Sequence, residues 1–214
     1  MADNITASPA RVRNRRGEGA RLRDDIVAAA VELLDETGDE KAVTLRSVAR
    51  RVGIAAPSIY RHFPDQPTIM LAVVQQAFAE LEQHLSAALT AAGDEPRDRL
   101  FAFCRGYLDF AELHPERYRT MFGGLWMPAL GETTLTEADL ATLGDATLGM
   151  LMEIVRECVG AGESTSTDVS VDAVALWLGL HGLAHQRAST VAFRWPPGIA
   201  DRMITTLAHL KNAT

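Results

Sequence analysis

The residues best able to do chemistry lie close together, in the short stretch from 44 to 65. Its second half contains Ser58, Tyr60, Arg61 and His62. Hydroxyl, guanidinium and imidazole groups of this kind donate hydrogen bonds to phosphate oxygens and to the edges of bases. A stretch this short has no stable structure of its own in water, so neighbouring elements must hold these side chains at a surface.

Two short helices joined by a glycine turn are predicted to position these groups. Residues 45–52 place apolar side chains at positions i, i+3, i+4 and i+7, which gathers them on one buried face. Thr44 is a suitable N-cap, and Gly53 stands where the backbone must turn with positive φ. Pro57 and Pro64 suit the first turn and the end of a second, two-turn helix. This helix-turn-helix pattern indicates DNA binding.

The motif resembles that of the TetR family of bacterial transcriptional regulators. Its closing residues here read Tyr60-Arg61-His62-Phe63, and the strict match covers about residues 24 to 75. The resemblance implies an all-α chain, with an N-terminal three-helix helix-turn-helix domain and a C-terminal helical domain for ligand binding and dimerisation. The expected division is a flexible basic arm at 1–20, the helix-turn-helix domain at 21–67 and the effector-binding and dimerisation domain at 68–214.

By the same resemblance, two groups of residues would contact DNA. Small side chains at the front of the second helix would meet base edges: Ala56, Pro57 and Ser58. Side chains around them would hydrogen-bond phosphates: Thr44, Tyr60 and His62. Arg46 could do either.

Two positions depart from the family pattern. Gln66 stands where a lysine usually pairs with a phosphate, so DNA affinity is expected to be lower by one contact. Ala55 stands where a Ser or Thr often caps the second helix, which removes a cap worth about 1 kcal/mol.

Charge is divided unevenly along the chain. The net charge is −7, but residues 1–67 carry eleven basic against ten acidic side chains, a balance of +1, and the remainder carries −8. Six arginines fall between positions 11 and 23. Such a segment could follow a phosphate backbone or enter a minor groove, and an ordinary solvated tail is an equally open interpretation. The acidic remainder should keep the second domain away from DNA.

The rest of the chain is predicted to be helical, because no segment alternates with period two for long enough to form a sheet. A loop at about 123–136, with Trp126 and Met127, would lie over an apolar cavity, either as a lid or simply packed down. The expected helices cover about residues 22–34, 66–92, 100–111, 115–121, 138–159, 169–191 and 198–210.

An effector cavity would lie between the helices of residues 100–190. Large side chains there are the candidate lining residues, each of which could instead be ordinary core: Phe103, Tyr107, Met121, Phe122, Trp126, Met150, Trp177 and His181. Trp177 and His181 are followed by Gly182, an order that resembles one TetR C-terminal subclass. That resemblance implies a homodimer through the last two helices, with Gly179, Gly182 and Ala184 allowing close helix approach.

No catalytic, metal or cofactor site is predicted. The sequence contains none of the motifs Gly-x-Ser-x-Gly, Gly-x-x-x-x-Gly-Lys-Ser/Thr or His-Glu-x-x-His, so an enzyme is not expected. His181 and His185 could chelate a metal at i, i+4, but no further ligand is placed beside them by sequence. Cys104 and Cys158 are expected to be buried core residues. No run is apolar enough to span a bilayer, and a cytoplasmic location is expected.

These observations predict a DNA-binding regulator that acts as a homodimer. It would repress transcription at a short near-palindromic operator and leave when a small apolar or amphipathic effector fills the cavity. The alternative is an effector-independent DNA-binding protein with an architectural or interaction role. A cavity filled by collapsed core would favour that alternative.

Overall fold

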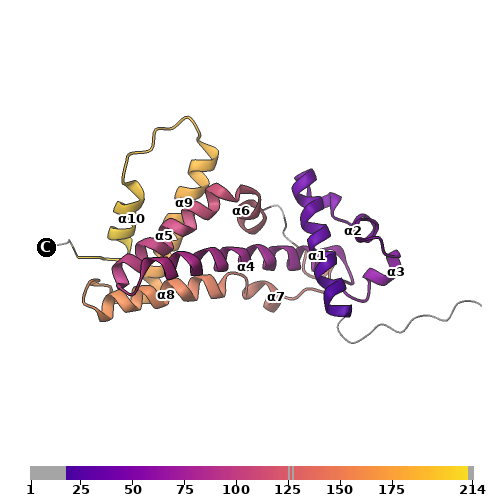
Figure 1. The fold of residues 1–214 in the computed structure, drawn as a ribbon, viewed down its shortest axis with the longest axis horizontal. Coiled ribbons are helices and arrows are strands. Elements are labelled where there is room, and N and C mark those ends of the chain that lie inside the picture. The colour runs from indigo at the N-terminus through magenta and orange to yellow at the C-terminus, as the bar shows by residue number, and fades with distance from the viewer. Residues whose placement is uncertain (1–17, 125, 127, 212–214) are drawn as a thin grey trace, which may run out of the picture. The chain divides into compact units, whose positions relative to one another are not determined.

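A computed structural model describes residues 18–124, 126 and 128–211, and these residues are helical with no strand (Figure 1). The chain divides into two compact units, one ending at Gln66 and the other beginning at Pro67. Over the described residues, no helix combines the length and apolar character that crossing a bilayer requires. The predicted all-α class with an N-terminal helix-turn-helix is therefore confirmed.

The described residues of the N-terminal unit form three α-helices and a short 3₁₀ segment. They are α1 (Glu18–Thr37), η1 (Glu40–Ala42), α2 (Leu45–Val52) and α3 (Ala56–Ile59). Its core is formed by fully or almost fully buried side chains from all three α-helices and the segment after α3, including Ile26, Val48, Ile59 and Phe63. The guanidinium of Arg23 covers the Phe63 ring, with 5.0 Å between its central carbon and the ring centroid.

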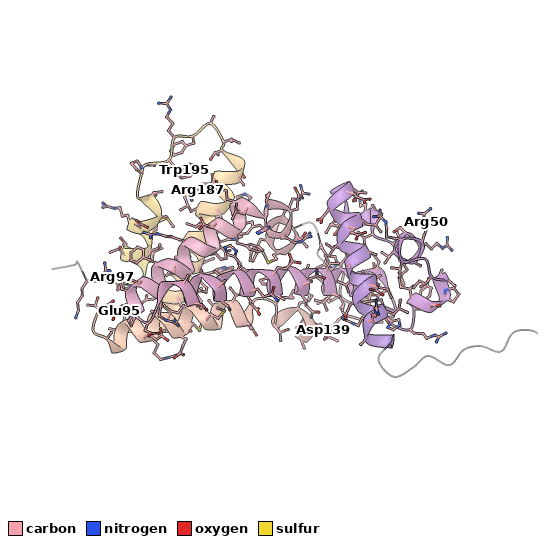
Figure 2. All side chains as sticks on the ribbon, in the orientation of Figure 1. Arg50, Glu95, Arg97, Asp139, Arg187 and Trp195 are labelled. Carbon is pink, nitrogen blue, oxygen red and sulfur yellow. The ribbon has the colours of Figure 1, made fainter. Side chains whose placement is uncertain are left out.

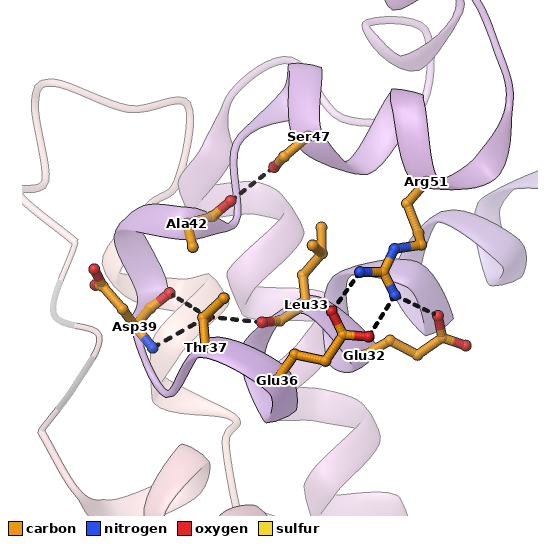
Figure 3. A network of polar contacts seen from close by, with 8 residues as sticks. All are labelled: Glu32, Leu33, Glu36, Thr37, Asp39, Ala42, Ser47 and Arg51. Carbon is orange, nitrogen blue, oxygen red and sulfur yellow. Dashed lines mark hydrogen bonds and ion pairs between the residues drawn. The ribbon is translucent and has the colours of Figure 1, made fainter.

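A polar network joins α1 to α2 at the surface (Figure 3). Arg51 of α2 makes two hydrogen bonds to the Glu36 carboxylate, at 2.8 and 2.5 Å, and a third to Glu32 at 3.3 Å. The hydrogen bonds from Arg51 lower the pKa of Glu36 below its usual value. Ser47 donates to the carbonyl of Ala42 at 2.7 Å, which fixes the start of α2 to η1. The two helices are thus held at a set angle by both packing and polar contacts.

Among its described residues the C-terminal unit has seven helices, and most of them contribute to one core. Leu81 and Leu85 of α4 pack with side chains of α5, α8, α9 and α10, such as Phe103, Leu151 and Leu180. The helices are α4 (Gln66–Ala92), α5 (Pro96–Leu113), α6 (Pro115–Phe122), α7 (Glu137–Ala141), α8 (Asp145–Gly160), α9 (Val169–Ser189) and α10 (Ile199–Leu207).

The helix predicted over 138–159 is interrupted, which is a correction with a clear cause. It is two helices, α7 and α8, separated at Gly144, whose φ is +81°. A side chain at this position would be strained by that φ, and its Cβ would lie only 3.0 Å from the Phe78 ring. The backbone can therefore pass Phe78 and restart as α8 only with glycine here.

Small residues in α9 serve a different purpose from the one predicted. A Cβ on Gly179 would meet Leu207 of α10 at 2.7 Å, so this glycine permits close packing of α9 and α10 within one chain. Ala184 is buried in the same core. Gly182 alone faces open space among the described atoms. Of the three residues predicted to admit a second subunit, only Gly182 is available for that role.

Candidate functional site

The start of α2 is fixed by a reciprocal cap. Ser47 N–H donates to the Thr44 hydroxyl at 3.1 Å, and Thr44 N–H donates to the Ser47 hydroxyl at 2.9 Å. Gly53 ends α2 in the left-handed region, with φ of +77°. The predicted cap and turn are confirmed, while the partner role of Ser47 was not foreseen. A Thr at N-cap with Ser three residues later is the signal that could have indicated it.

The second helix of the motif is shorter than predicted. Regular α3 covers only Ala56–Ile59, and Ala55 precedes it without a side-chain cap. The predicted length of two turns is wrong, because residues after Ile59 continue as hydrogen-bonded turns, with His62 N–H donating to the Ile59 carbonyl at 2.9 Å. Burial of Ile59 and Phe63 anchors this segment in place of a cap.

The motif presents its polar residues outward from this anchor. Tyr60 is 55% exposed, which is high for an aromatic side chain. Thr44, Arg46 and Pro57 are also exposed, whereas the other predicted contact residues are half-buried: Ala56, Ser58 and His62. All seven residues predicted to contact DNA therefore retain some accessible surface.

Basic side chains around the motif differ in what they contact. Arg51 is engaged by Glu36 and Glu32, as described above. No ion pair joins Arg46, Arg50 or Arg61 to any residue that the structure describes. Figure 2 shows the Arg50 side chain extending outward from α2. These three guanidinium groups are thus available to phosphates.

Two further sequence predictions concern this unit. The Gln66 side chain donates to the Glu40 carbonyl at 3.2 Å, so its amide ties the start of α4 to η1. The basic arm predicted at 1–20 lies almost wholly outside the described residues, which begin at 18.

The C-terminal unit contains an apolar cavity of about 270 Å³. Aromatic and aliphatic side chains from α4, α5, α6, α8 and α9 form its wall, and Gly144 and Asp145 at the start of α8 also line it. Larger hollows lie elsewhere, such as one of about 450 Å³ lined by Glu112, Arg187 and Trp195, the last two labelled in Figure 2. We take this cavity as the ligand site because a mainly apolar and aromatic wall is typical of small-molecule sites.

The cavity includes most, but not all, of the residues predicted to line it. It is lined by Phe103, Tyr107, Met121, Phe122 and Trp177. Three predicted residues lie outside it: Trp126 lines a neighbouring hollow, Met150 packs against the core, and His181 is held in a hydrogen-bonded cluster. Met127 is outside the described residues. The lining residues that sequence reasoning missed are Phe78, Leu143, Gly144, Asp145, Thr147, Leu148, Leu151 and Leu180.

Hydrogen bonds and stacked rings surround His181. Its Nδ1 lies 2.7 Å from the Tyr118 hydroxyl, which is 3.3 Å from that of Tyr107. Trp177 stacks on the imidazole, with ring centroids 5.7 Å apart. Burial raises the pKa of both tyrosines and lowers that of His181. This is the core-histidine alternative that the sequence left open.

A pH dependence of stability follows from His181. Because its pKa in the folded protein lies below the value of 6.5 for a free histidine, the unfolded chain binds the proton more readily. We expect the melting temperature to fall as pH decreases from about 7.5 to 5.5. His181→Gln should reduce this slope, measured by circular dichroism. His185 also lowers the pKa of His181 through its charge, so exposed His114 is the better control, and an equal slope change in His114→Gln would contradict the assignment.

Both cysteines are buried in the C-terminal core, as predicted. Burial raises the pKa of Cys104 far above its usual value and that of Cys158 to about 11, so both thiols stay protonated near neutral pH. No group of three or more metal-ligating side chains is gathered within the described part of the chain, and His181 and His185 have no third ligand there.

Comparisons with known proteins agree with this architecture. The family model for tetracyclin repressor-like C-terminal domains matches residues 100–210, just over half of the chain, and that for the tetR family of bacterial regulatory proteins matches residues 26–73. A Rhodococcus sp. RHA1 protein of unknown function has a similar structure, with a TM-score of 0.69, 26% identity and coverage of 87% of this chain and 91% of that one.

Two curated relatives are matched over part of their length. The HTH-type transcriptional regulator BetI of Stenotrophomonas maltophilia is 27% identical over 92 residues, 43% of this chain and 46% of the relative. The HTH-type transcriptional activator FasR of Mycolicibacterium smegmatis is 31% identical over 112 residues, 51% of this chain and 50% of the relative. The chain thus spans about half the length of the curated relatives it matches. With both family models matched in the expected order, the chain belongs to the tetR family of bacterial regulatory proteins.

Proposed function

We propose that the protein is a homodimeric transcriptional regulator that binds a near-palindromic DNA operator and releases it when a small apolar or amphipathic molecule fills the C-terminal cavity. The exposed tip of the helix-turn-helix is the observation that carries the DNA part. Ile59 and Phe63 are buried and hold a segment whose Tyr60 is 55% exposed. The flanking Arg46, Arg50 and Arg61 have no ion pair among the described residues. Repression follows if the operator overlaps the polymerase site.

The cavity supports control by an effector. Its volume of about 270 Å³ is open space and not collapsed core, which argues against the effector-independent alternative. Phe78 lines it and belongs to α4, the helix that begins at the last residue of the N-terminal unit. A ligand that moves this helix needs to change DNA affinity by only about 1 to 3 kcal/mol, or roughly 5- to 150-fold, to act as a switch.

Operator binding can be tested with sequences selected by the protein itself. We expect selection from a random duplex pool to yield a near-palindrome, and fluorescence anisotropy on it to show two subunits per site with affinity that falls as salt rises. Tyr60→Ala should lose about 1.5 to 3 kcal/mol per half-site, the value of a hydrogen bond to a charged group.

A matched control isolates the hydroxyl of that side chain. Tyr60→Phe keeps the exposed ring, so an equal loss would assign the effect to the phosphate hydrogen bond. No enrichment of any sequence, or unchanged affinity in Tyr60→Ala, would contradict the proposed interface.

A further inference from the structure

One buried hydroxyl in the cavity wall has no hydrogen-bond partner among the described residues. It is that of Thr147, a lining residue on α8 that is only 6% exposed. An unsatisfied buried hydroxyl destabilises a protein, and valine would fill the same volume without that cost. The other buried threonine of this unit, Thr120, donates to the Glu116 carbonyl at 2.9 Å. The Thr147 hydroxyl is thus suited to a hydrogen-bond partner from outside the chain.

The start of α8 favours a hydrogen-bond acceptor in the same place. Gly144 precedes the helix and supplies no side-chain cap. Backbone N–H groups in the first turn of a helix have no intrahelical acceptor, and together they carry a partial positive charge. Thr147 is the third residue of α8, so its own backbone N–H is one of these donors, whereas that of Asp145 already donates to the Thr142 carbonyl at 3.3 Å. A ligand oxygen here could accept from both the hydroxyl and the backbone N–H of Thr147.

The charge of the lining residues and the size of the cavity restrict the class of ligand further. Asp145 is exposed and is the one formally charged side chain among the described lining residues, so a ligand carboxylate would be repelled at this end. The Tyr107 hydroxyl is already paired with Tyr118. A cavity of about 150 Å³ takes up one benzene ring, so the present volume suits one or two rings against the aromatic wall.

We propose that the cavity binds an uncharged carbonyl compound of one or two rings, whose oxygen accepts a hydrogen bond from the Thr147 hydroxyl at the start of α8. The inference rests on the proposed effector role of the cavity. It adds to that role a ligand class and an anchoring residue.

Three naphthalene-based probes test the ligand class by calorimetry on the full chain. They are 2-acetylnaphthalene, a neutral ketone, naphthalene, which lacks the acetyl group, and 2-naphthoate, an anion. We expect the ketone to bind most tightly. Thr147→Val should weaken ketone binding roughly three- to tenfold, the value of one hydrogen bond, and leave naphthalene unchanged. Thr147→Ser should restore ketone binding, and Asp145→Asn should strengthen binding of 2-naphthoate alone.

Two controls make the outcome specific. Thr120→Val removes a hydroxyl that is already paired and should not change the affinity of any probe. Thr147→Val should raise the melting temperature of the ligand-free protein, because it removes an unsatisfied group and keeps the volume. A melting temperature that falls instead would place the hydroxyl in the native hydrogen-bond network and contradict its role as a free anchor.

The possible failures are distinguishable. Equal binding of ketone and naphthalene, unchanged by Thr147→Val, would overturn the anchor and leave the cavity as a ligand site. Ketone binding through Thr147 without any change in operator affinity would uphold the anchor and overturn effector control. Binding of none of the probes to the wild-type protein would overturn the ligand class and the anchor, and effector control would then be decided by whether other apolar compounds release the operator.

Discussion

Phe63→Ala is expected to abolish operator binding by unfolding the helix-turn-helix unit while the C-terminal unit stays folded. Phe63 is only 2% exposed and, with Ile59, anchors a segment whose helix α3 lacks a side-chain cap. Truncation of a buried phenylalanine costs about 3 to 5 kcal/mol. A unit this small has stability near the lower end of about 5 to 15 kcal/mol, so the loss removes most of it.

The measurement must separate unfolding from loss of a contact. Hydrogen exchange should show protection lost in α1, α2 and α3 and retained in α5 and α8, together with anisotropy that falls to the level of non-specific DNA. Phe63→Leu is the matched control: it keeps most of the apolar volume and should bind the operator. Protected α2 amides in Phe63→Ala, or wild-type DNA affinity, would show that this ring does not support the motif.

Most of the N-terminal unit could be predicted because local sequence features determine where its helices begin and end. The Thr44 cap, the Gly53 turn and the apolar spacing of residues 45–52 each depend on neighbours within one or two turns of chain. Such features can be recognised in a sequence without knowledge of the tertiary packing. The same reasoning overestimated the length of α3. The residues after Ile59 keep helical spacing and bury Phe63, but they form turns and not a regular helix.

The cavity was only partly predictable, because its shape depends on contacts between distant segments. The break at Gly144 exists because the chain must pass the Phe78 ring, a residue far away in sequence. Because the prediction joined α7 and α8 in one helix, it missed the start of α8. It therefore also missed Asp145 and Thr147, which line the cavity. Which way a side chain points is fixed by such contacts, and this also explains why Met150 was wrongly placed.

Large aromatic residues were easier to assign. Phe103, Tyr107 and Trp177 line the cavity because bulky rings in a helical unit are drawn to its interior. His181, one turn from Trp177, was harder, because its Nδ1 finds Tyr118 of α6, and pairing across helices has no signature in a single sequence. The size of a side chain can thus be read from the sequence, whereas hydrogen-bond pairing between different helices cannot.

We expect Leu178→Arg to convert a dimer into a monomer. Leu178 is 54% exposed and lies two turns after Val171, which is 60% exposed, and one turn before Gly182, which faces open space. These residues form one apolar face of α9, and a face of this kind indicates a partner. A buried charge without a partner costs about 3 to 5 kcal/mol, and twofold symmetry places it in the interface twice. The dissociation constant should rise at least about a thousandfold.

Leu113→Arg provides the control, since Leu113 on α5 is 66% exposed and is not part of that face. Sedimentation equilibrium should find it dimeric with a wild-type melting temperature. A dimeric Leu178→Arg protein would exclude this face of α9 from the interface.

The monomer would also separate the two activities proposed for the chain. Two half-sites one helical turn apart require two linked recognition units, so operator affinity should fall with the dimer. The described residues that line the cavity do not include Val171, Leu178 or Gly182. The Leu178→Arg monomer should therefore still bind 2-acetylnaphthalene with wild-type affinity. Loss of both activities together would mean that the partner subunit is needed to complete the cavity, and that effector binding and dimerisation are coupled through α9.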